Sequence, residues 1–324
     1  DRWGLRKALS FFTLSSVAGY VWLLASPHWT GVILSAFLFL SWTSFSLPAT
    51  FSLVGSSLAA NQHAMGIGVQ ATLKRIPIIL GPVAGGLLID RFGIINGIRF
   101  GIITAIVLGC LTVAIQWQIQ EVPGTRSPAG CFSFWQSAQS FSPALRRLLV
   151  SDVLVRFCER IPYAWVILYA MDDLGLTATQ FGVLTGIEMA SAIVCLIPVA
   201  YLSDRYGREP FVIVTFIFFT LFPVSLLAAH SFRGLCVAFV IRGLKEFGEM
   251  ARKSLIIQLS PEPRRGQTIG TYYLIRDCLA TAAAFLGAAL WSISPKTNFV
   301  GAAAIGASGT LLYVWTARRV PSSE

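Results

Sequence analysis

Charged side chains recur inside long apolar runs of this sequence. A charge near the middle of a membrane-spanning segment is costly, so it is kept where it faces a polar cavity or a partner of opposite sign. Such residues are therefore candidates for carrying protons or for binding a polar solute. Seven of them are basic: Lys74, Arg75, Arg156, Arg160, Arg242, Lys245 and Arg276. Six are acidic: Asp152, Glu159, Glu188, Glu246, Glu249 and Asp277.

Glu188 lies near the centre of its apolar run, with no basic residue within one helical turn. Its carboxylate therefore needs a base from another helix, or a proton. The candidates for that base are Arg156, Arg242 and Arg276. We expect Glu188 to carry protons, being protonated in one conformational state and ion-paired in the other. The alternative is a permanent salt bridge that holds the helices together and never titrates.

Other charges have neighbours at helical spacing. Three pairs are four residues apart, which allows neutralisation on one helix face: Arg242 with Glu246, Lys245 with Glu249, and Asp152 with Arg156. The adjacent residues Arg276 and Asp277 are expected to point in different directions. For Lys245 and Glu249, neutralisation of one by the other on the same helix explains their presence as well as a functional role does. The candidate substrate and proton pathway therefore consists of Glu188, Arg156, Glu159, Arg242, Glu246, Arg276, Asp277, Lys74 and Arg75.

The elements that must position these charges are membrane-spanning helices. The chain of 324 residues is 55% hydrophobic and 12% charged. It holds more apolar runs of about 20 residues than a soluble protein can bury. The sequence therefore predicts an all-α polytopic membrane protein. Ten spans are expected, at about 8–26, 31–54, 65–88, 94–117, 148–171, 179–202, 211–230, 234–257, 267–292 and 298–316.

One connection is long. Residues 118–147 are rich in Ser, Pro and Gln and carry Arg126, Arg146 and Arg147. This composition is typical of a linker. We expect an N-terminal helical bundle over residues 1–117, a cytoplasmic linker over 118–147 and a C-terminal bundle over 148–324.

The distribution of basic residues predicts the orientation, because Lys and Arg accumulate in cytoplasmic loops. With the linker in the cytoplasm, four basic residues fall in outer loops: Arg91, Arg99, Arg233 and Lys296. Fourteen fall in cytoplasmic segments: Arg2, Arg6, Lys7, Arg126, Arg146, Arg147, Arg205, Arg208, Arg252, Lys253, Arg264, Arg265, Arg318 and Arg319. Both termini are then cytoplasmic. Loops that face anionic lipid account for the net charge of +10 without a nucleic acid partner.

A polar turn occurs twice at corresponding places. Residues 201–210 read YLSDRYGREP, and the chain begins DRWGLRK, with Asp, Arg and Gly repeating at an offset of 203 residues. Gly permits a tight turn, Asp can cap a helix or pair with Arg, and the bases favour the cytoplasm. The repeated residues, with one further base, are Asp1, Arg2, Gly4, Asp204, Arg205, Gly207 and Arg208.

This repeated turn resembles the loop signature of the major facilitator superfamily of secondary transporters. The resemblance implies two pseudo-symmetric bundles that rock around a site at the membrane midplane. It also implies twelve helices, so that the ten spans correspond to helices three to twelve and two helices upstream of the first motif are missing. Helices five, seven, eight, ten and eleven then carry the internal charges. In the superfamily these helices line the central cavity, and the repeated turn controls the conformational state.

Two further motifs are similar to patterns of the superfamily. Gly68, Pro77, Gly81-Pro82 and Gly85-Gly86 follow its antiporter signature on helix five, except that Pro77 replaces a usual Gly. Small residues permit close helix packing and Pro82 bends the helix, so Gly81, Pro82, Gly85 and Gly86 are expected to form a packing seam. Residues 242–248, RGLKEFG, resemble a proton-coupling motif, although the superfamily has that motif on helix four.

The resemblance implies proton-coupled efflux of a small, partly apolar solute. Uptake by symport, or a transport-inactive membrane sensor or assembly protein, are the alternatives. No Walker A sequence, metal-ligand cluster or nucleophile–His arrangement occurs, and the three His lie near span ends. We therefore expect no enzymatic activity, no cofactor and no metal. The expected partners are a small-molecule substrate, protons and the lipid bilayer, for a monomer in the plasma (inner) membrane.

Overall fold

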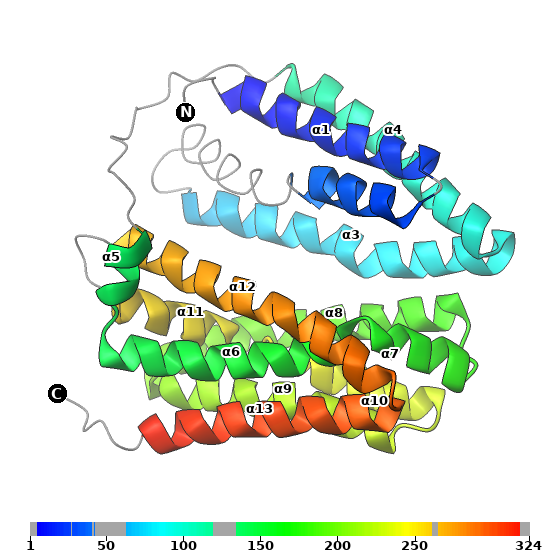
Figure 1. Cartoon of the computed structure of the whole chain (residues 1–324). Helices are drawn as coiled ribbons and strands as arrows, with labels where there is room; N and C mark the ends of the chain where they lie inside the picture. The colour runs from blue at the N-terminus through cyan, green and yellow to red at the C-terminus, as the bar shows by residue number, and fades with distance from the viewer. Residues whose placement is uncertain are drawn as a thin grey trace. The chain divides into compact units, whose positions relative to one another are not determined.

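A computed structural model describes residues 5–26, 28–40, 42, 63–118, 134–260 and 265–317. Every regular element in these ranges is a helix (Figure 1). The chain divides into two compact units, Asp1–Gly130 and Cys131–Glu324. The boundary lies inside the stretch 118–147 that the sequence suggests as a linker. Each unit is described by itself.

The first unit contains helices α1 (Leu5–Ala25), α3 (His63–Phe92) and α4 (Ile94–Gln116), with a further helical segment, Trp29–Leu40. Helix α4 packs against α1 and α3. The turn between α3 and α4 is made by Gly93, whose φ of 79° is strained for any residue with a side chain. Most of the second half of the predicted span 31–54 lies outside the described residues.

The second unit is a larger bundle. Its elements are α5 (Phe134–Gln139), α6 (Pro143–Tyr163), α7 (Trp165–Leu168), η2 (Tyr169–Asp173), α8 (Ala178–Tyr206), α9 (Glu209–Ala228), α10 (Phe232–Leu244), α11 (Glu249–Gln258), α12 (Arg265–Trp291) and α13 (Pro295–Ala317). Helix α13 packs against α6 and α9, α12 packs against α6, and α10 packs against α8 and α9.

Local sequence signals begin these helices where they are observed. The Ser142 side chain accepts a hydrogen bond from the Leu145 backbone at the start of α6. Thr177 and Gln180 form a reciprocal capping box at the start of α8. The Ser231 side chain accepts from the Gly234 backbone at the start of α10. Each capping group satisfies a backbone N–H that has no partner inside its own helix.

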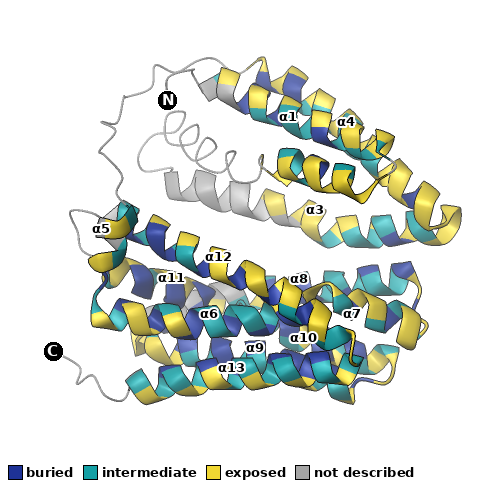
Figure 2. Cartoon of the chain, viewed as in Figure 1, coloured by how far each residue is buried: buried dark blue, intermediate teal, exposed yellow. Residues whose placement is uncertain are grey.

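Five described helices are long and apolar enough to cross a membrane, and they lie within α4, α8, α9, α12 and α13. Figure 2 marks exposed residues along these helices in yellow. Their exposed faces carry large apolar side chains such as Leu108, Val194 and Phe285. Lipid, in place of water, is the natural solvent for such faces. Two predicted spans of the second unit depart from this uninterrupted form.

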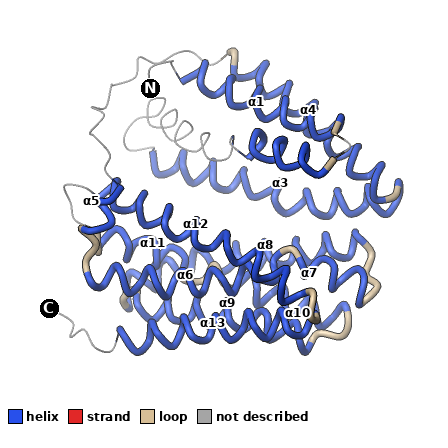
Figure 3. The backbone as a smooth tube through the Cα atoms, viewed as in Figure 1, coloured by secondary structure: helices blue, strands red, loops and turns tan. Residues whose placement is uncertain are grey.

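The predicted span 234–257 is broken. Helix α10 ends at Leu244, residues Lys245–Gly248 form a turn, and α11 begins at Glu249. The prediction of one continuous helix is wrong here, because the close approach of Gly248 to α9 diverts the backbone. The predicted span 148–171 also changes form, since α6 ends at Tyr163 and the chain continues through α7 into a π-helical turn. Figure 3 marks these interruptions among the helices.

The stretch 118–147 is not irregular throughout. Its C-terminal part forms α5 and the start of α6, and α5 packs against α12. Phe141, which connects the two helices, is buried in the core cluster of the second unit with Leu145 and Leu148. Residues 134–147 therefore belong to this bundle.

Candidate functional site

A continuous network of acidic and basic side chains lies inside the second unit. It joins residues from α6, α8, α10, the α10–α11 break, α11 and α12. The acids are Asp152, Glu159, Glu188, Glu249 and Asp277, and the bases are Arg156, Arg242, Lys245, Arg252, Lys253 and Arg276. The helices bring together residues that are up to about 120 positions apart, such as Asp152 and Tyr272.

Asp152, on α6, is completely buried and has polar partners from two other helices. One of its carboxylate oxygens pairs with Arg252 of α11. The other accepts a hydrogen bond of 3.0 Å from the Tyr272 hydroxyl and lies 3.6 Å from Nη1 of Arg276, both on α12. A buried carboxylate needs this kind of support, because the loss of its hydration must be offset by charge and hydrogen bonding.

Glu188, on α8, has two bases beside the same oxygen. Arg242 Nε lies 3.2 Å from Glu188 Oε1, and Lys245 Nζ lies 3.0 Å from it. The Glu188 side chain is 4% exposed. Lys245 also lies 3.0 Å from Oε1 of Glu159 on α6, so one ammonium group joins carboxylates from two helices.

Arg156 connects the two ends of the network. Its Nη1 lies 2.7 Å from Glu159 Oε2, and its Nη2 lies 3.5 Å from Glu249 Oε2. Glu249 also lies 2.5 Å from Nη2 of Arg252. Along the chain of contacts from Glu188 to Asp152, every acid therefore has a cationic partner. A proton added to Glu188 would leave Arg242 without its acidic partner, whereas Lys245 would keep Glu159.

Two local pairings differ from those expected. Arg242 pairs with Glu188 in place of Glu246, and Lys245 pairs with Glu159 and Glu188 in place of Glu249. The reason is the break at Lys245–Gly248, which removes the regular spacing of residues four apart. Asp152 and Arg156, on the unbroken α6, remain 3.9 Å apart.

The expectation for Arg276 and Asp277 is wrong. Nε of Arg276 donates to Oδ1 of Asp277 at 2.8 Å, and Nη2 lies 2.7 Å from the same oxygen. The Cβ atoms of adjacent residues do point apart, but the long arginine side chain folds back far enough to reach the neighbouring carboxylate.

Arg252 is a member of the network that the sequence did not single out. The charge count assigns Arg252 to a cytoplasmic segment, whereas the structure buries it completely against Asp152 and Glu249. Its spacing of three residues from Glu249 and seven from Lys245 was the available signal, since such residues share a helix face.

Three of the predicted pathway residues are not joined to this network. The side chain of Glu246, in the break, makes no hydrogen bond or ion pair with a described residue. Lys74 lies on α3 in the first unit with an exposed side chain, and the side chain of Arg75 lies outside the described part. The structure does not place these two bases relative to the network.

The second copy of the repeated turn lies between α8 and α9. Gly207 ends α8 with a φ of 87°, a backbone conformation that favours glycine. Arg208 Nη1 donates to Oε1 of Gln258 on α11 at 3.0 Å, while Arg205 is exposed with its guanidinium over the Tyr206 ring. Asp1, Arg2, Gly4 and the side chain of Asp204 lie outside the described residues.

The expected packing seam on α3 has no neighbour in the described part of its unit. A Cβ added at Gly81 or Gly85 would meet no described atom within 4 Å. The close approach of α3 and α4 occurs instead at Gly97, whose added Cβ would lie 2.6 Å from Ile89 Cα. Gly86 is buried and Pro82 partly buried. A seam at Gly81 and Gly85 stays a prediction.

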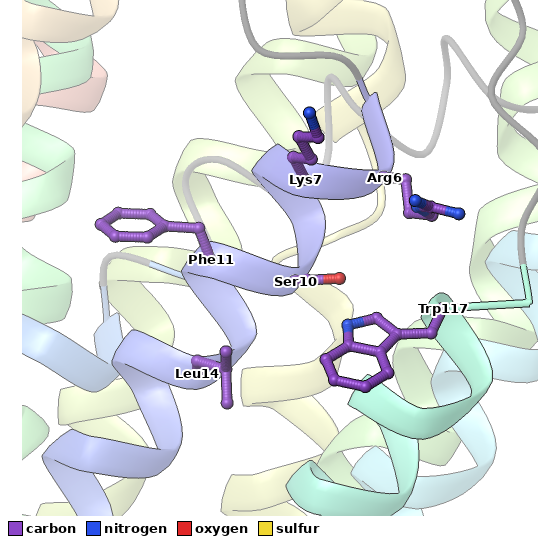
Figure 4. A pocket seen from close by; sticks show the side chains of 6 residues that line it. All are labelled: Arg6, Lys7, Ser10, Phe11, Leu14 and Trp117. Carbon is purple, nitrogen blue, oxygen red and sulfur yellow. The ribbon is translucent and has the colours of Figure 1, made fainter.

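The first unit has a hollow of its own at the start of α1. It is lined by Arg6, Lys7, Ser10, Phe11, Leu14 and Trp117 (Figure 4). Figure 4 shows Ser10 and Phe11 projecting from opposite sides of the helix. None of the predicted pathway residues lines this hollow.

The comparison with protein families decides the assignment. The family model described as "Major Facilitator Superfamily" matches residues 148–324. This range is more than half of the chain and includes the whole ion-pair network. The chain belongs to the Major Facilitator Superfamily. It is thus an integral, all-α polytopic membrane protein, as the apolar spans predict.

A relative of this superfamily chain comes from Cupriavidus pinatubonensis (strain JMP 134 / LMG 1197). It is described as a probable 4-methylmuconolactone transporter and is 34% identical over 97 residues. The aligned part is 30% of this chain and spans 23% of the relative.

Solved structures share the fold of this superfamily chain. The peptide transporter POT, in complex with sulfate, matches with a TM-score of 0.75 at 14% identity, over 97% of this chain and 80% of that one. A bacterial homolog of the human lysosomal transporter Spinster, inward-facing and unoccupied, matches with a TM-score of 0.72 at 12% identity, over 98% and 84%. A bacterial metal transporter matches with a TM-score of 0.70 at 14% identity, over 97% and 84%.

Proposed function

We propose that this protein is a secondary active transporter that exports a small, partly apolar solute in exchange for protons, by alternating access. The observation that carries the proposal is the position of Glu188. Its carboxylate is nearly buried on a membrane helix, and its two bases, Arg242 and Lys245, come from a neighbouring span that is broken at that point. An ionisable group inside a span is a functional candidate because an unpaired charge there is costly.

Glu188 is the group proposed to carry the proton. In the observed arrangement it is ion-paired, which corresponds to the unprotonated state. Protonation would remove the negative charge that Arg242 and Lys245 share, so those bases would favour other partners. Lys245 already has one in Glu159, at 3.0 Å. A proton that favours one arrangement of these contacts over another can shift the balance between two conformational states.

Superfamily membership and the named relatives support a solute-transport function. The C. pinatubonensis relative, a probable 4-methylmuconolactone transporter, supports a small organic solute. The direction rests on the resemblance of the Gly and Pro pattern on α3 to the antiporter signature. We therefore propose efflux, in keeping with that pattern.

The same proposal includes an orientation and a location. The bias of basic residues supports a cytoplasmic linker and cytoplasmic termini. We propose a monomer in the plasma (inner) membrane, in contact with its lipids. A single cysteine at Gly130→Cys, with the natural cysteines replaced, should resist an impermeant thiol reagent added to intact cells. Ready labelling from outside would overturn this orientation.

Proteoliposomes test the transport function directly. The full-length protein is reconstituted with a pH-sensitive dye inside, and 4-methylmuconolactone is supplied on either side of the membrane. If the protein exchanges the solute for protons, protons should move in the direction opposite to the solute. Movement of both in the same direction would indicate symport. Stabilisation of the purified protein by the solute without any flux would indicate a transport-inactive sensor.

A further inference from the structure

Arg160 is a base of the second unit that the ion-pair network leaves out. It lies in the last turn of α6, in the middle of the predicted span 148–171, and its side chain is exposed. Among the bases that the sequence places inside spans of this unit, Arg156, Arg242, Lys245 and Arg276 all pair with acids. Arg160 makes no ion pair with any described residue. An intramembrane guanidinium of this kind needs a counter-charge.

The surroundings of Arg160 are aromatic and basic. Its guanidinium carbon lies 5.7 Å from the centre of the Tyr163 ring, and that of Arg242 lies 5.6 Å from the same centre. Both guanidinium groups therefore lie beside one aromatic ring. Tyr163 is 55% exposed, so its ring is accessible.

The carboxylate of Glu188 does not neutralise the Arg160 guanidinium. Arg242 has Glu188 as its ion-pair partner, and Glu188 shares its oxygen with Lys245. Glu159, the other acid of this region, is occupied by Lys245 and Arg156. Of the two guanidinium groups beside the Tyr163 ring, only that of Arg242 has an acidic partner among the described residues.

We propose that Arg160, Tyr163 and Arg242 form a binding site for the carboxylate of a small, partly apolar organic anion. The planar, forked guanidinium matches a carboxylate, and the apolar part of the solute would pack against the Tyr163 ring. The inference rests on the proposed transport function and adds the charge of the solute. A lipid phosphate is disfavoured because Arg160 lies near the middle of its span, away from the headgroups.

The test measures the thermal stability of the purified full-length protein in neutral detergent. The probes are benzoate, cyclohexanecarboxylate and isobutyrate, each compared with its uncharged amide, with phosphatidylglycerol in a separate arm. At least one carboxylate should raise Tm more than its amide does. In Arg160→Gln, its apparent affinity should fall about tenfold or more, which corresponds to the loss of one charge-assisted contact. Arg160→Lys should retain part of the affinity.

Arg233→Gln is the matched control, because it removes an exposed arginine at the start of α10. It should leave the affinity unchanged. The proposal is overturned if no carboxylate binds better than its amide, or if Arg160→Gln keeps full affinity for the carboxylate. It is also overturned if the binding of phosphatidylglycerol depends on Arg160 and the binding of carboxylates does not. Proton-coupled flux without a preference for carboxylates would refute the anion site and leave the transport function standing. Carboxylate binding that depends on Arg160, without any flux, would support the anion site and refute the transport function.

Discussion

Helices α9 and α13 differ sharply from the broken pair α10–α11 in the same unit. Helix α9 is uninterrupted and is long and apolar enough to cross a membrane. Helix α13 is likewise unbroken and packs against α6 and α9. The α10–α11 span instead carries Arg242, Lys245 and Arg252 and is interrupted for four residues. Helices α9 and α13 thus form an apolar, continuous frame, whereas α10–α11 is a charged span that departs from regular helical form.

The break remains satisfied by hydrogen bonds. The N–H groups of Lys245, Glu246 and Phe247 each donate to the carbonyl three residues earlier. The N–H of Gly248 donates to Thr215 Oγ1 of α9 at 2.5 Å. Irregular backbone inside a membrane is tolerated where protein groups of this kind satisfy it. The comparison predicts that variants in the charged span lower the free energy of unfolding more than variants in the frame do.

The largest effect is expected for Arg252→Met. This change leaves Asp152 buried without its principal counter-charge, and breaking a buried pair in this way costs about 3–5 kcal/mol of unfolding free energy. Unfolding in detergent micelles measures it. The double variant Asp152→Asn with Arg252→Met should recover part of the loss, because it removes the unpaired charge.

The matched variant in the frame is Thr310→Val. Thr310 and Thr220 hydroxyls lie 3.3 Å apart between α13 and α9, and the loss of such a bond costs about 1 kcal/mol. An Arg252→Met variant that is no less stable than Thr310→Val would abolish the distinction between network and frame.

An effect on stability between those of Arg252→Met and Thr310→Val is expected for Gly248→Ala. A Cβ there would lie 2.6 Å from both Phe211 C and Thr215 Oγ1, and such overpacking costs roughly 1–3 kcal/mol. Gly270→Ala is the control, because an added Cβ on that helix meets no described atom within 4 Å. It should be neutral or stabilising by up to about 1 kcal/mol. Equal effects of the two variants would mean that α9 does not restrain the break.

The smallest effect on stability is expected for Arg208→Gln. Its bond to Gln258 is exposed, so the loss should be about 1 kcal/mol or less. Transport should nevertheless fall, because the bond joins the α8–α9 turn to α11. Rates of solute exchange in proteoliposomes measure this. Normal transport by Arg208→Gln would indicate that the turn serves only to set the topology of the chain.

Much of the fold follows from composition and spacing. Long apolar runs predict membrane helices whatever their partners are, so the all-α polytopic fold was accessible from sequence. The partner of Glu188 was accessible as a short set of bases on other helices, because its own helix offers none. Arg242 is a member of that set, and the structure pairs it with Glu188.

The remaining features depend on contacts between helices. The break at Lys245–Gly248 results from the approach of Gly248 to Phe211 and Thr215, which are distant in the chain. Once the helix is broken, spacing no longer predicts which acid Lys245 meets. Arg252 was assigned to the cytoplasm because a count of basic residues contains no information on burial. These assignments need three-dimensional packing.

The most direct test of the central claim uses Glu188→Gln in proteoliposomes, with Asp172→Asn as a control at an exposed acid outside the network. Two quantities are measured with 4-methylmuconolactone: solute movement against its gradient when a proton gradient is imposed, and exchange of labelled for unlabelled solute without one. If Glu188 carries the coupled proton, Glu188→Gln loses gradient-driven movement and keeps exchange, while Asp172→Asn keeps both. A folded Glu188→Gln protein that still moves solute against its gradient would contradict the account.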